Sequence, residues 1–338
     1  MARPSASHPL IHCRSWGLGH SHAKLANFNF SSLLTFALTA FLILATTRFF
    51  TQDHSNRVAT VGVPLKCHSH NDYWRRRPLY DALEAGCIGV EADIWRRNND
   101  LYVAHNAPNT ARTPTLSSLY VQPLVHLLER RNLLRTTSPP HGVFPRFPNQ
   151  TLVFMIDFKE PDREAFAMLH AQLQPLRERG WLTFYANNSV TYRPVTVVLT
   201  GDAILDWVLS NTTYRDVFLD APALALHADT DRQYNWTNSF YSSAKFGHAL
   251  GMFSGYFGAP HGVDEYVEMA HERGLHMRFW SQPAWPVAMR NRLWGDLVDA
   301  GVDFLNVDDL AGVNRWLAER NDIGRGSVVA EEIPVFLD

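Results

Sequence analysis

The chain has 338 residues, of which 46% are hydrophobic and 19% are charged, and its formal net charge is −2. This length suits one large domain with a substantial core or two small domains. The near-neutral charge gives no reason to expect nucleic acid as a partner, and an aromatic content of 12% excludes a largely disordered chain.

The first 50 residues differ in composition from the rest of the chain. No acidic residue precedes Asp53, and a basic leader, residues 1–27, is followed by the apolar residues 28–50, which read FNFSSLLTFALTAFLILATTRFF. The uncharged run from residue 25 to residue 47 is long enough to cross a bilayer. We therefore predict a transmembrane signal anchor over 28–50 and a linker over 51–61. A cleaved signal peptide and a mitochondrial presequence are the alternatives.

Four Asn-x-Ser/Thr triplets lie beyond this segment and begin at Asn149, Asn187, Asn211 and Asn235. Such triplets are acceptors of N-linked glycans in secreted proteins. Together with the basic leader, they predict a membrane-anchored glycoprotein whose main domain lies in the secretory-pathway lumen or outside the cell. A mitochondrial location is the alternative.

The remaining chain alternates short β-branched runs with amphipathic stretches. Seven runs are predicted strands, at residues 64–68, 88–94, 152–158, 195–200, 217–220, 276–281 and 304–307, with a weaker eighth candidate near 249–253. Helical patterns occupy residues 79–85, 163–179, 203–210, 263–273 and 289–300. This alternation predicts a (β/α)8 TIM barrel over residues 62–320 and a tail over 321–338. A doubly wound open sheet is the alternative, although no Gly-rich dinucleotide turn supports it.

Two segments interrupt the alternation. Residues 112–148 are rich in Pro, Ser, Thr and Arg, and predict an extended connection with one helix around 121–133. Residues 181–193, WLTFYANNSVTYR, predict a hairpin inserted before the fourth strand.

The three cysteines, Cys13, Cys67 and Cys87, form neither a disulfide framework nor the clustered spacing of a zinc site. A bridge between Cys67 and Cys87 is one interpretation. Two buried free thiols near strands are the preferred interpretation, because free cysteine is commonly a core residue.

Polar side chains end the first three predicted barrel strands. His68, His70 and Asn71 end the first; Glu91 and Asp93 end the second, and the short segment LYVAHN after it carries His105; Asp157 and Lys159 end the third. Residues two apart on a strand point to the same side, and the active face of a TIM barrel lies at the carboxyl ends of its strands. We therefore expect these side chains to converge.

Three converging carboxylates, Glu91, Asp93 and Asp157, repel one another unless a cation neutralises them. A hard divalent ion with oxygen ligands meets this need, and we expect Mg²⁺ in preference to Ca²⁺. Histidines on either side suit general acid and base roles. For Glu91 or Asp93 alone, a strand-end ion pair with an arginine of residues 75–77 or 96–97 is the simpler interpretation. The set as a whole favours a site.

The same residues resemble a known family. The set His68, Glu91-x-Asp93, His105 and Asp157-x-Lys159 resembles the glycerophosphodiester phosphodiesterase and phosphatidylinositol-phospholipase-C-like superfamily. Residues 68–95, HSHNDYWRRRPLYDALEAGCIGVEADIW, are similar to the fungal altered inheritance of mitochondria protein six group. The Asp-x-Lys pair is also similar to sphingomyelinase D enzymes. The resemblance covers most of residues 62–310.

The resemblance implies a role for each matching residue. His68 and His105 would be the acid/base pair, with His70 as the alternative to His68, and Glu91, Asp93 and Asp157 would bind the ion. Asn71, Lys159 and Trp280 would contact the substrate. The sequence departs from the glycerophosphodiesterase pattern in having His-Ser-His-Asn where His-Arg-Gly is usual, and Asp as the third metal ligand where many members have Glu.

These features predict a metal-dependent phosphodiesterase acting on a glycerophosphodiester or a phospholipid headgroup, by hydrolysis or by formation of a cyclic phosphate. A catalytically silent, membrane-anchored barrel that binds a lipid or a protein partner is the alternative. A carbohydrate-active barrel with Glu91 and Asp157 as paired carboxylates would leave His68, His105 and Lys159 without a role. Asp308, at the end of the last strand, either orients a site residue or caps the following helix.

Overall fold

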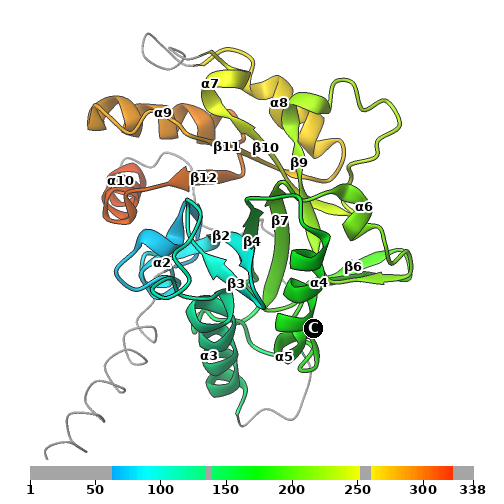
Figure 1. The fold of residues 1–338 in the computed structure, drawn as a ribbon. Helices are drawn as coiled ribbons and strands as arrows, with labels where there is room; N and C mark the ends of the chain where they lie inside the picture. Colours follow the sequence, from blue (N-terminus) through cyan, green and yellow to red (C-terminus); the bar gives the residue numbers. More distant parts are fainter. Residues whose placement is uncertain (1–62, 134–138, 252–259, 323–338) are drawn as a thin grey trace, which may run out of the picture. The chain divides into compact units, whose positions relative to one another are not determined.

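The computed structural model describes residues 63–133, 139–251 and 260–322. Eight parallel strands in these residues close into a barrel, because the first strand pairs with both the second and the last (Figure 1). In the order in which they neighbour one another, the barrel strands are β1 (Leu65–Ser69), β2 (Cys87–Arg97), β4 (Leu152–Phe158), β7 (Val195–Gly201), β9 (Phe218–Pro222), β10 (Ser239–Lys245), β11 (His276–Trp280) and β12 (Phe304–Val307). The predicted TIM barrel is confirmed, and closure excludes the doubly wound sheet.

Helices pack around the outside of the strands (Figure 1). They are η1 (Asp72–Trp74), α2 (Tyr80–Glu84), the π-helical turn η2 (Ser117–Val121), α3 (Gln122–Asn132), α4 (Arg163–Gln172), α5 (Gln174–Arg177), α6 (Leu205–Val208), η3 (Ala223–Ala225), α7 (Phe246–Ala249), α8 (Val263–His271), α9 (Val287–Asp299) and α10 (Leu310–Asp322). Helix α4 begins where it does because the Asp162 carboxylate accepts hydrogen bonds from the Glu164 and Ala165 amides.

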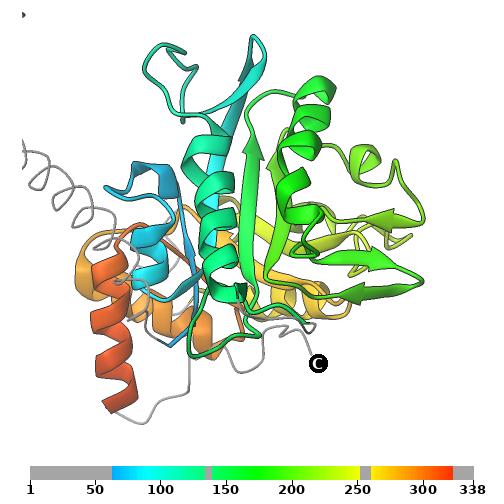
Figure 2. The same cartoon turned by 90° about the horizontal axis from the view of Figure 1, so that it is seen from below.

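Strand β2 continues past the barrel and forms a ribbon with β3 (Asp100–Val103), which is antiparallel to it (Figure 2). This ribbon leads the chain back to His105. The hairpin predicted at 181–193 is present as β5 (Phe184–Ala186) and β6 (Ser189–Thr191), and β8 (Tyr214–Arg215) extends it into a separate three-stranded sheet.

The eighth strand lies at a different position from the predicted one. The sequence predicts it near 249–253, whereas the structure has β10 at Ser239–Lys245 and puts Ala249 at the end of helix α7. Residues 252 and 253 lie outside the described residues. Strand β10 reads SFYSSAK, and its polar side chains Ser242 and Ser243 are buried in the barrel. The prediction was wrong because this strand is not a continuous apolar run.

Cys67 and Cys87 form a disulfide bond between the adjacent strands β1 and β2. The preferred prediction of two free thiols was therefore wrong. Both residues are buried, as predicted, but strand pairing brings their Cα atoms to 4.7 Å, which is within bonding range.

The predicted leader, anchor and linker, residues 1–61, and the predicted tail beyond Asp322 lie outside the described residues. Within the part of the chain that the structure describes, no helix has both the length and the hydrophobicity to span a membrane.

Candidate active site

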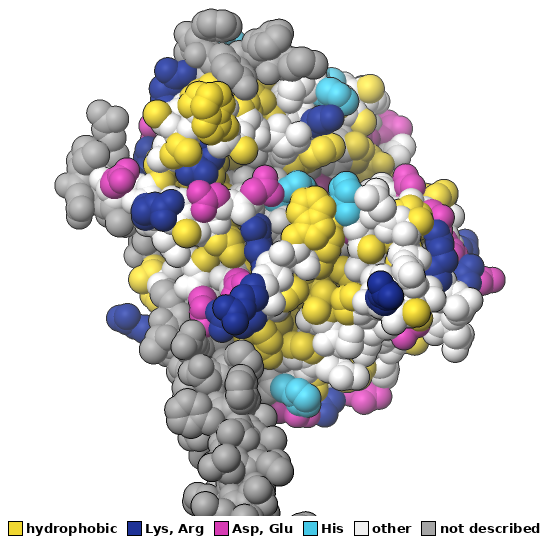
Figure 3. All heavy atoms as spheres, turned by 60° about the vertical axis from the view of Figure 1, so that its left-hand side comes forward, with side chains coloured by type: hydrophobic (Ala, Val, Ile, Leu, Met, Phe, Trp, Pro, Cys, Tyr) yellow, Lys and Arg dark blue, Asp and Glu magenta, His cyan; other side chains and the backbone are white. Residues whose placement is uncertain are grey.

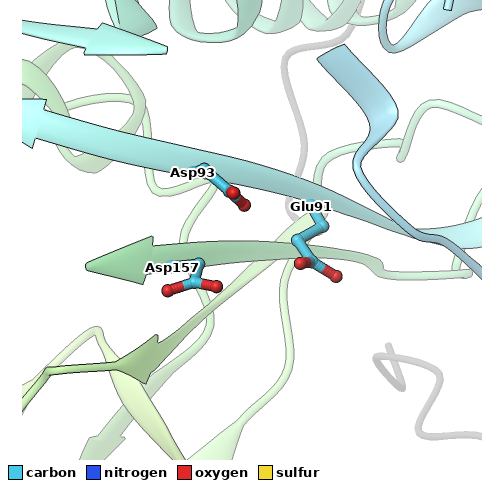
Figure 4. A group of neighbouring side chains, drawn as sticks. All are labelled: Glu91, Asp93 and Asp157. Atoms are coloured by element: carbon cyan, nitrogen blue, oxygen red, sulfur yellow. The ribbon is translucent and has the colours of Figure 1, made fainter. Parts of the chain in front are cut away.

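Three carboxylates meet at the carboxyl ends of two neighbouring barrel strands. Glu91 and Asp93 project from β2 and Asp157 from β4, and the three side chains point into the same space (Figure 4). One carboxylate oxygen from each lies within 4.8 Å of the others. Strand register accounts for this meeting, because Glu91 pairs with Met155 and Asp93 with Asp157. Burial raises the pKa of Asp157 to about 7 against the opposing effect of Lys159, so this cluster is short of positive charge.

Lys159 and Tyr73 hold one side of the cluster. The Lys159 ammonium lies 2.7 Å from oxygens of both Asp93 and Asp157, and the Tyr73 hydroxyl lies 2.8 Å from Asp93 Oδ2 and from Asn71 Oδ1. The other Asp93 oxygen, Oδ1, is buried and has no hydrogen-bond partner among the described residues. A buried carboxylate oxygen without a partner is costly, so Asp93 Oδ1 is an available ligand.

The three carboxylates suit a divalent cation. Six-coordinate Mg²⁺ with oxygens at about 2.1 Å places its ligands about 3 to 4 Å apart, and Ca²⁺ allows slightly more. The spread of the oxygens in the cluster and the unpaired Asp93 Oδ1 are both consistent with such an ion. The arginines of the alternative pair elsewhere: Arg77 with Asp81 and Glu84, Arg96 with Asp162, and Arg97 with Glu160. Glu91 instead lies 3.7 Å from a different arginine, Arg278.

The two candidate histidines of the first strand lie in different places. His70 lines a cavity of about 590 Å³ at this end of the barrel, and its Nδ1 lies 2.8 Å from Asp308 Oδ1. Burial lowers the pKa of His70, but the hydrogen bond with Asp308 and the nearby Glu91 carboxylate outweigh it and leave the pKa above the ordinary value. Asp308 therefore orients a site residue, which was one of its two predicted roles.

His68 lies deeper, below the cavity. Its side chain is fully buried, its Nε2 lies 3.3 Å from Glu91 Oε2, and its ring meets the edge of Tyr241. Burial, with Arg278 nearby, lowers the pKa of His68 to about 4, so the imidazole is neutral at physiological pH. Burial opposes ionisation of Glu91, but the hydrogen bond with His68, together with the nearby His70 and Arg278, outweighs burial and lowers the pKa of Glu91 to about 2. His68 supports Glu91 without lining the cavity.

His105 also lines the cavity. Its Nδ1 lies 3.1 Å from Asp93 Oδ2, and its ring lies against Trp74. Of the nine site residues predicted from the sequence, seven line the cavity: His70, Asn71, Glu91, His105, Asp157, Lys159 and Trp280. Asp93 contacts several of them from behind, and His68 lies below.

Sequence analysis missed several residues that complete the cavity. The buried Arg278 guanidinium donates to Asn306 at 2.7 Å and to Ser243 at 3.0 Å, and lies 3.7 Å from Glu91. Asp220 accepts from Thr200 and Arg278, while its Oδ1 is buried without a partner among the described residues. A charge inside the apolar run HMRFW, two residues before Trp280, was the signal for Arg278. Tyr73 lies in the short helix η1 and had no comparable signal.

Comparison with known proteins places this geometry in a family. Residues 56–220 match the model of the AIM6-like phosphodiesterase domain. Altered inheritance of mitochondria protein 6 of Eremothecium gossypii is 36% identical over 274 residues, which are 76% of this chain and 70% of that protein. The Arthroderma benhamiae homolog is 36% identical over 73% of this chain and 82% of its own length, and the Lachancea thermotolerans protein is 38% identical over 77% and 67%. The chain belongs to the altered inheritance of mitochondria protein 6 family, whose matching domain is of the phosphodiesterase type.

Proposed function

We propose that this chain is a metal-dependent phosphodiesterase that cleaves a glycerophosphodiester or a phospholipid headgroup. The observation that carries the proposal is a cavity lined by two carboxylates, two histidines and one lysine, with the third carboxylate, Asp93, directly behind them. A phosphodiester is an anion, and its cleavage builds further negative charge on the phosphoryl oxygens. A site with both cationic and acid/base groups suits that chemistry.

The histidines would move the protons. We propose His70 and His105 as the acid/base pair, because both line the cavity, whereas His68 does not. One accepts the proton of the attacking water or substrate hydroxyl as the new P–O bond forms, and the other donates a proton to the leaving oxygen as the old bond breaks. Attack by water gives hydrolysis; attack by a substrate hydroxyl gives a cyclic phosphate. Asp308 and Asp93 would hold the two imidazoles in orientation.

Glu91, Asp93 and Asp157 would hold one divalent ion, with Mg²⁺ preferred to Ca²⁺. When bound, the ion would supply positive charge to the phosphoryl oxygens. Lys159, 2.7 Å from two of these carboxylates, would bring a further positive charge to the same place. The unpaired Oδ1 of Asp220 would accept a hydrogen bond from a hydroxyl or ammonium group of the headgroup.

For localisation we propose membrane anchoring through residues 28–50, with the barrel in the secretory lumen or outside the cell. The relatives are named for inheritance of mitochondria, which is compatible with the mitochondrial alternative.

The test is phosphodiesterase activity of the full chain on a panel of glycerophosphodiesters, lysophospholipids and phosphoinositides, with Mg²⁺, Ca²⁺ or a chelator. We expect metal-dependent turnover that His70→Ala, His105→Ala and Glu91→Ala each reduce at least about a hundredfold. His126→Ala, on the exposed face of α3, is the matched control and should retain full activity.

Three results would change the proposal. If turnover persists both in the presence of the chelator and in Glu91→Ala, then the reaction does not depend on a metal ion. A folded protein that binds a divalent ion through Glu91 but turns over no substrate would favour the binding module. If His68→Ala retains a folded site and loses more activity than His70→Ala, then the assignment of the first histidine reverts to His68.

A further inference from the structure

Exposed hydrophobic side chains concentrate at one end of the barrel. Ten large hydrophobic side chains are exposed in the described residues, and six of them lie at or beyond the carboxyl end of a barrel strand. These six, which we call the apolar rim, are Trp74, Ile204, Leu224, Trp280, Trp285 and Val287. On the face shown in Figure 3, hydrophobic side chains gather in groups, one of them directly beside histidines.

Several members of the apolar rim line the cavity, contact a lining residue or lie close to one in the chain. Trp280 lines the cavity itself, and the Trp74 ring packs on His105 with 5.3 Å between centroids. Ile204 lies between two cavity-lining residues, and Leu224 follows the lining residue Pro222 by two positions. The rim therefore comes from the loops after four strands, β1, β7, β9 and β11, and it is continuous with the site.

The loop after β11 carries the most exposed part of the rim. Residues 284–288, Ala-Trp-Pro-Val-Ala, are all exposed; Trp285 is 76% exposed and Val287 is 50% exposed. No charged residue lies between Arg278 and Arg290. An uncovered apolar loop of this kind costs free energy in water and marks a surface that is covered in use.

The residue types in the rim favour a phospholipid bilayer as its binding partner. Tryptophan prefers the boundary between lipid and water, where its ring is apolar and its N–H finds a polar partner. Cations accompany two of the tryptophans: the Lys245 ammonium lies 5.7 Å from the centre of the Trp280 ring, and the exposed Arg76 follows Trp74 by two residues in the chain. Ile204 is flanked instead by the exposed Asp202 and Asp206. Apolar side chains flanked by cations complement the acyl region and phosphate layer of a phospholipid surface.

We propose that the apolar rim docks the barrel on a phospholipid bilayer, so that the cavity receives its substrate from the membrane surface. A flat protein partner on the rim would close the cavity mouth, whereas a bilayer presents phosphodiester headgroups to it. The docking stands on the rim alone, while the substrate class, a bilayer phospholipid in preference to a soluble phosphodiester, rests on the proposed function.

The first test measures whether Trp285 inserts into a lipid bilayer, and it does not require catalytic turnover. Full-length protein is incorporated in phosphatidylcholine vesicles that contain lipids brominated on their acyl chains, and tryptophan fluorescence is recorded for the wild type and for Trp285→Phe. We expect bromine to quench a component of wild-type emission that Trp285→Phe lacks. Equal quenching of the two proteins would overturn the docking proposal, even if the chain is anchored elsewhere.

The substrate class is tested with Trp285→Ser/Val287→Ser. These residues lie outside the proposed catalytic and binding groups, so the double variant should keep its rate on a soluble glycerophosphodiester and lose about tenfold or more on vesicle phospholipid. Leu133→Ser, which is equally exposed (79%) at the end of α3, is the matched control and should change neither rate. Equal losses on both substrates would overturn the substrate class. Absence of turnover on both would refute the proposed function and leave the quenching result to decide on docking.

Discussion

The Asp308 carboxylate, directly after the last barrel strand, raises the pKa of His70. We expect Asp308→Asn to lower the pKa of His70, because the hydrogen bond and negative charge that raise it are weakened. The limb of the pH–rate profile that reports His70 should then move to lower pH, with kcat reduced about tenfold. Asp309→Asn is the matched control: Asp309 pairs with Arg290 and the Gly312 amide, so its loss should leave the profile in place. If the pH–rate profile of Asp308→Asn is unchanged, then Asp308 does not affect the protonation of a catalytic group.

Gly201 lies directly against Asp157. A Cβ at this position would lie 2.0 Å from Asp157 Oδ1 and 2.5 Å from the Phe158 carbonyl oxygen, and φ is +68°. We expect Gly201→Ala to displace Asp157 and to weaken divalent-ion binding as measured by calorimetry. Gly180, with φ +67° and no atom within 4 Å of its Cβ position, is the matched control. Gly180→Ala should cost about 1–2 kcal/mol of strain and leave ion binding unchanged.

Strand alternation predicted the side on which these residues lie but not their depth. Glu91, Asp93 and Asp157 meet as predicted, because register between neighbouring parallel strands fixes their relative heights. His68 and His70 share the period-two pattern, yet one lies below the cavity and the other lines it. Side chains fill the interior of a TIM barrel in layers. The sequence alone does not show which layer borders the cavity and which lies below it.

Asp303 lies just before β12 and contacts residues of both helix α8 and strand β11. Its carboxylate lies 2.8 Å from His271 at the end of α8 and 3.5 Å from His276 at the start of β11, and it accepts from the Met277 amide at 2.7 Å. Burial opposes its ionisation, but the hydrogen bonds from the two histidines outweigh burial and hold the pKa of Asp303 below its usual range. The same hydrogen bond raises the pKa of His271.

These shifts predict a bell-shaped dependence of stability on pH. The contribution of Asp303 is present above the pKa of an unfolded Asp, about 3.9, and is lost as the pH falls through the lower folded value. The contribution of His271 is present below about 6.5 and is lost as the pH rises through its raised folded value. Asp303→Asn should lower the free energy of unfolding by about 1–3 kcal/mol near pH 5 and flatten this dependence. Denaturation curves from about pH 2 to about pH 8 measure both limbs of this dependence, with the exposed Asp299→Asn as control. A parallel offset at all pH values would contradict the assignment.

Seven of the eight barrel strands could be predicted because parallel strands are buried on both faces and read as apolar runs. Strand β10 could not, since Ser243 faces the cavity and bonds Arg278, and a run of serines reads as a turn. The predicted helical patterns match helices in position but not in length: the long pattern at 163–179 is two helices, α4 and α5, divided at Leu173 with Pro175 in the first turn of α5. Helices α7 and α10 were not among the predicted helical patterns.

The apolar rim and the glycan-acceptor triplets lie toward opposite ends of the barrel strands. The apolar rim lies at the carboxyl ends of the strands, whereas the triplets that begin at Asn149, Asn187, Asn211 and Asn235 lie in segments that lead into strands β4, β7, β9 and β10. Asn187 lies at the exposed turn between β5 and β6. Glycans at these positions would leave the rim and the cavity uncovered.

A lumenal barrel should carry a glycan at Asn187. We expect Ser189→Ala, which removes that acceptor triplet, to increase electrophoretic mobility by one glycan, and the matched Ser189→Thr, which keeps the triplet, to leave mobility unchanged. Glycosidase treatment should bring all three proteins to one mobility. A wild-type chain that glycosidase does not shift would place the barrel outside the secretory lumen and favour the mitochondrial alternative.

The bond between Cys67 and Cys87 makes the first two barrel strands sensitive to the redox poise of their surroundings. It closes a loop of 20 residues, which in the chain-entropy view contributes about 3 kcal/mol to stability. The loop includes His68, His70 and Asn71, and Glu91 and Asp93 follow it on β2. Disulfides persist in oxidising compartments and are rare where glutathione keeps thiols reduced. The disulfide would therefore form only after the chain has left a reducing compartment. Strands β1 and β2, which carry residues of the cavity, would be less stable before that oxidation than after it.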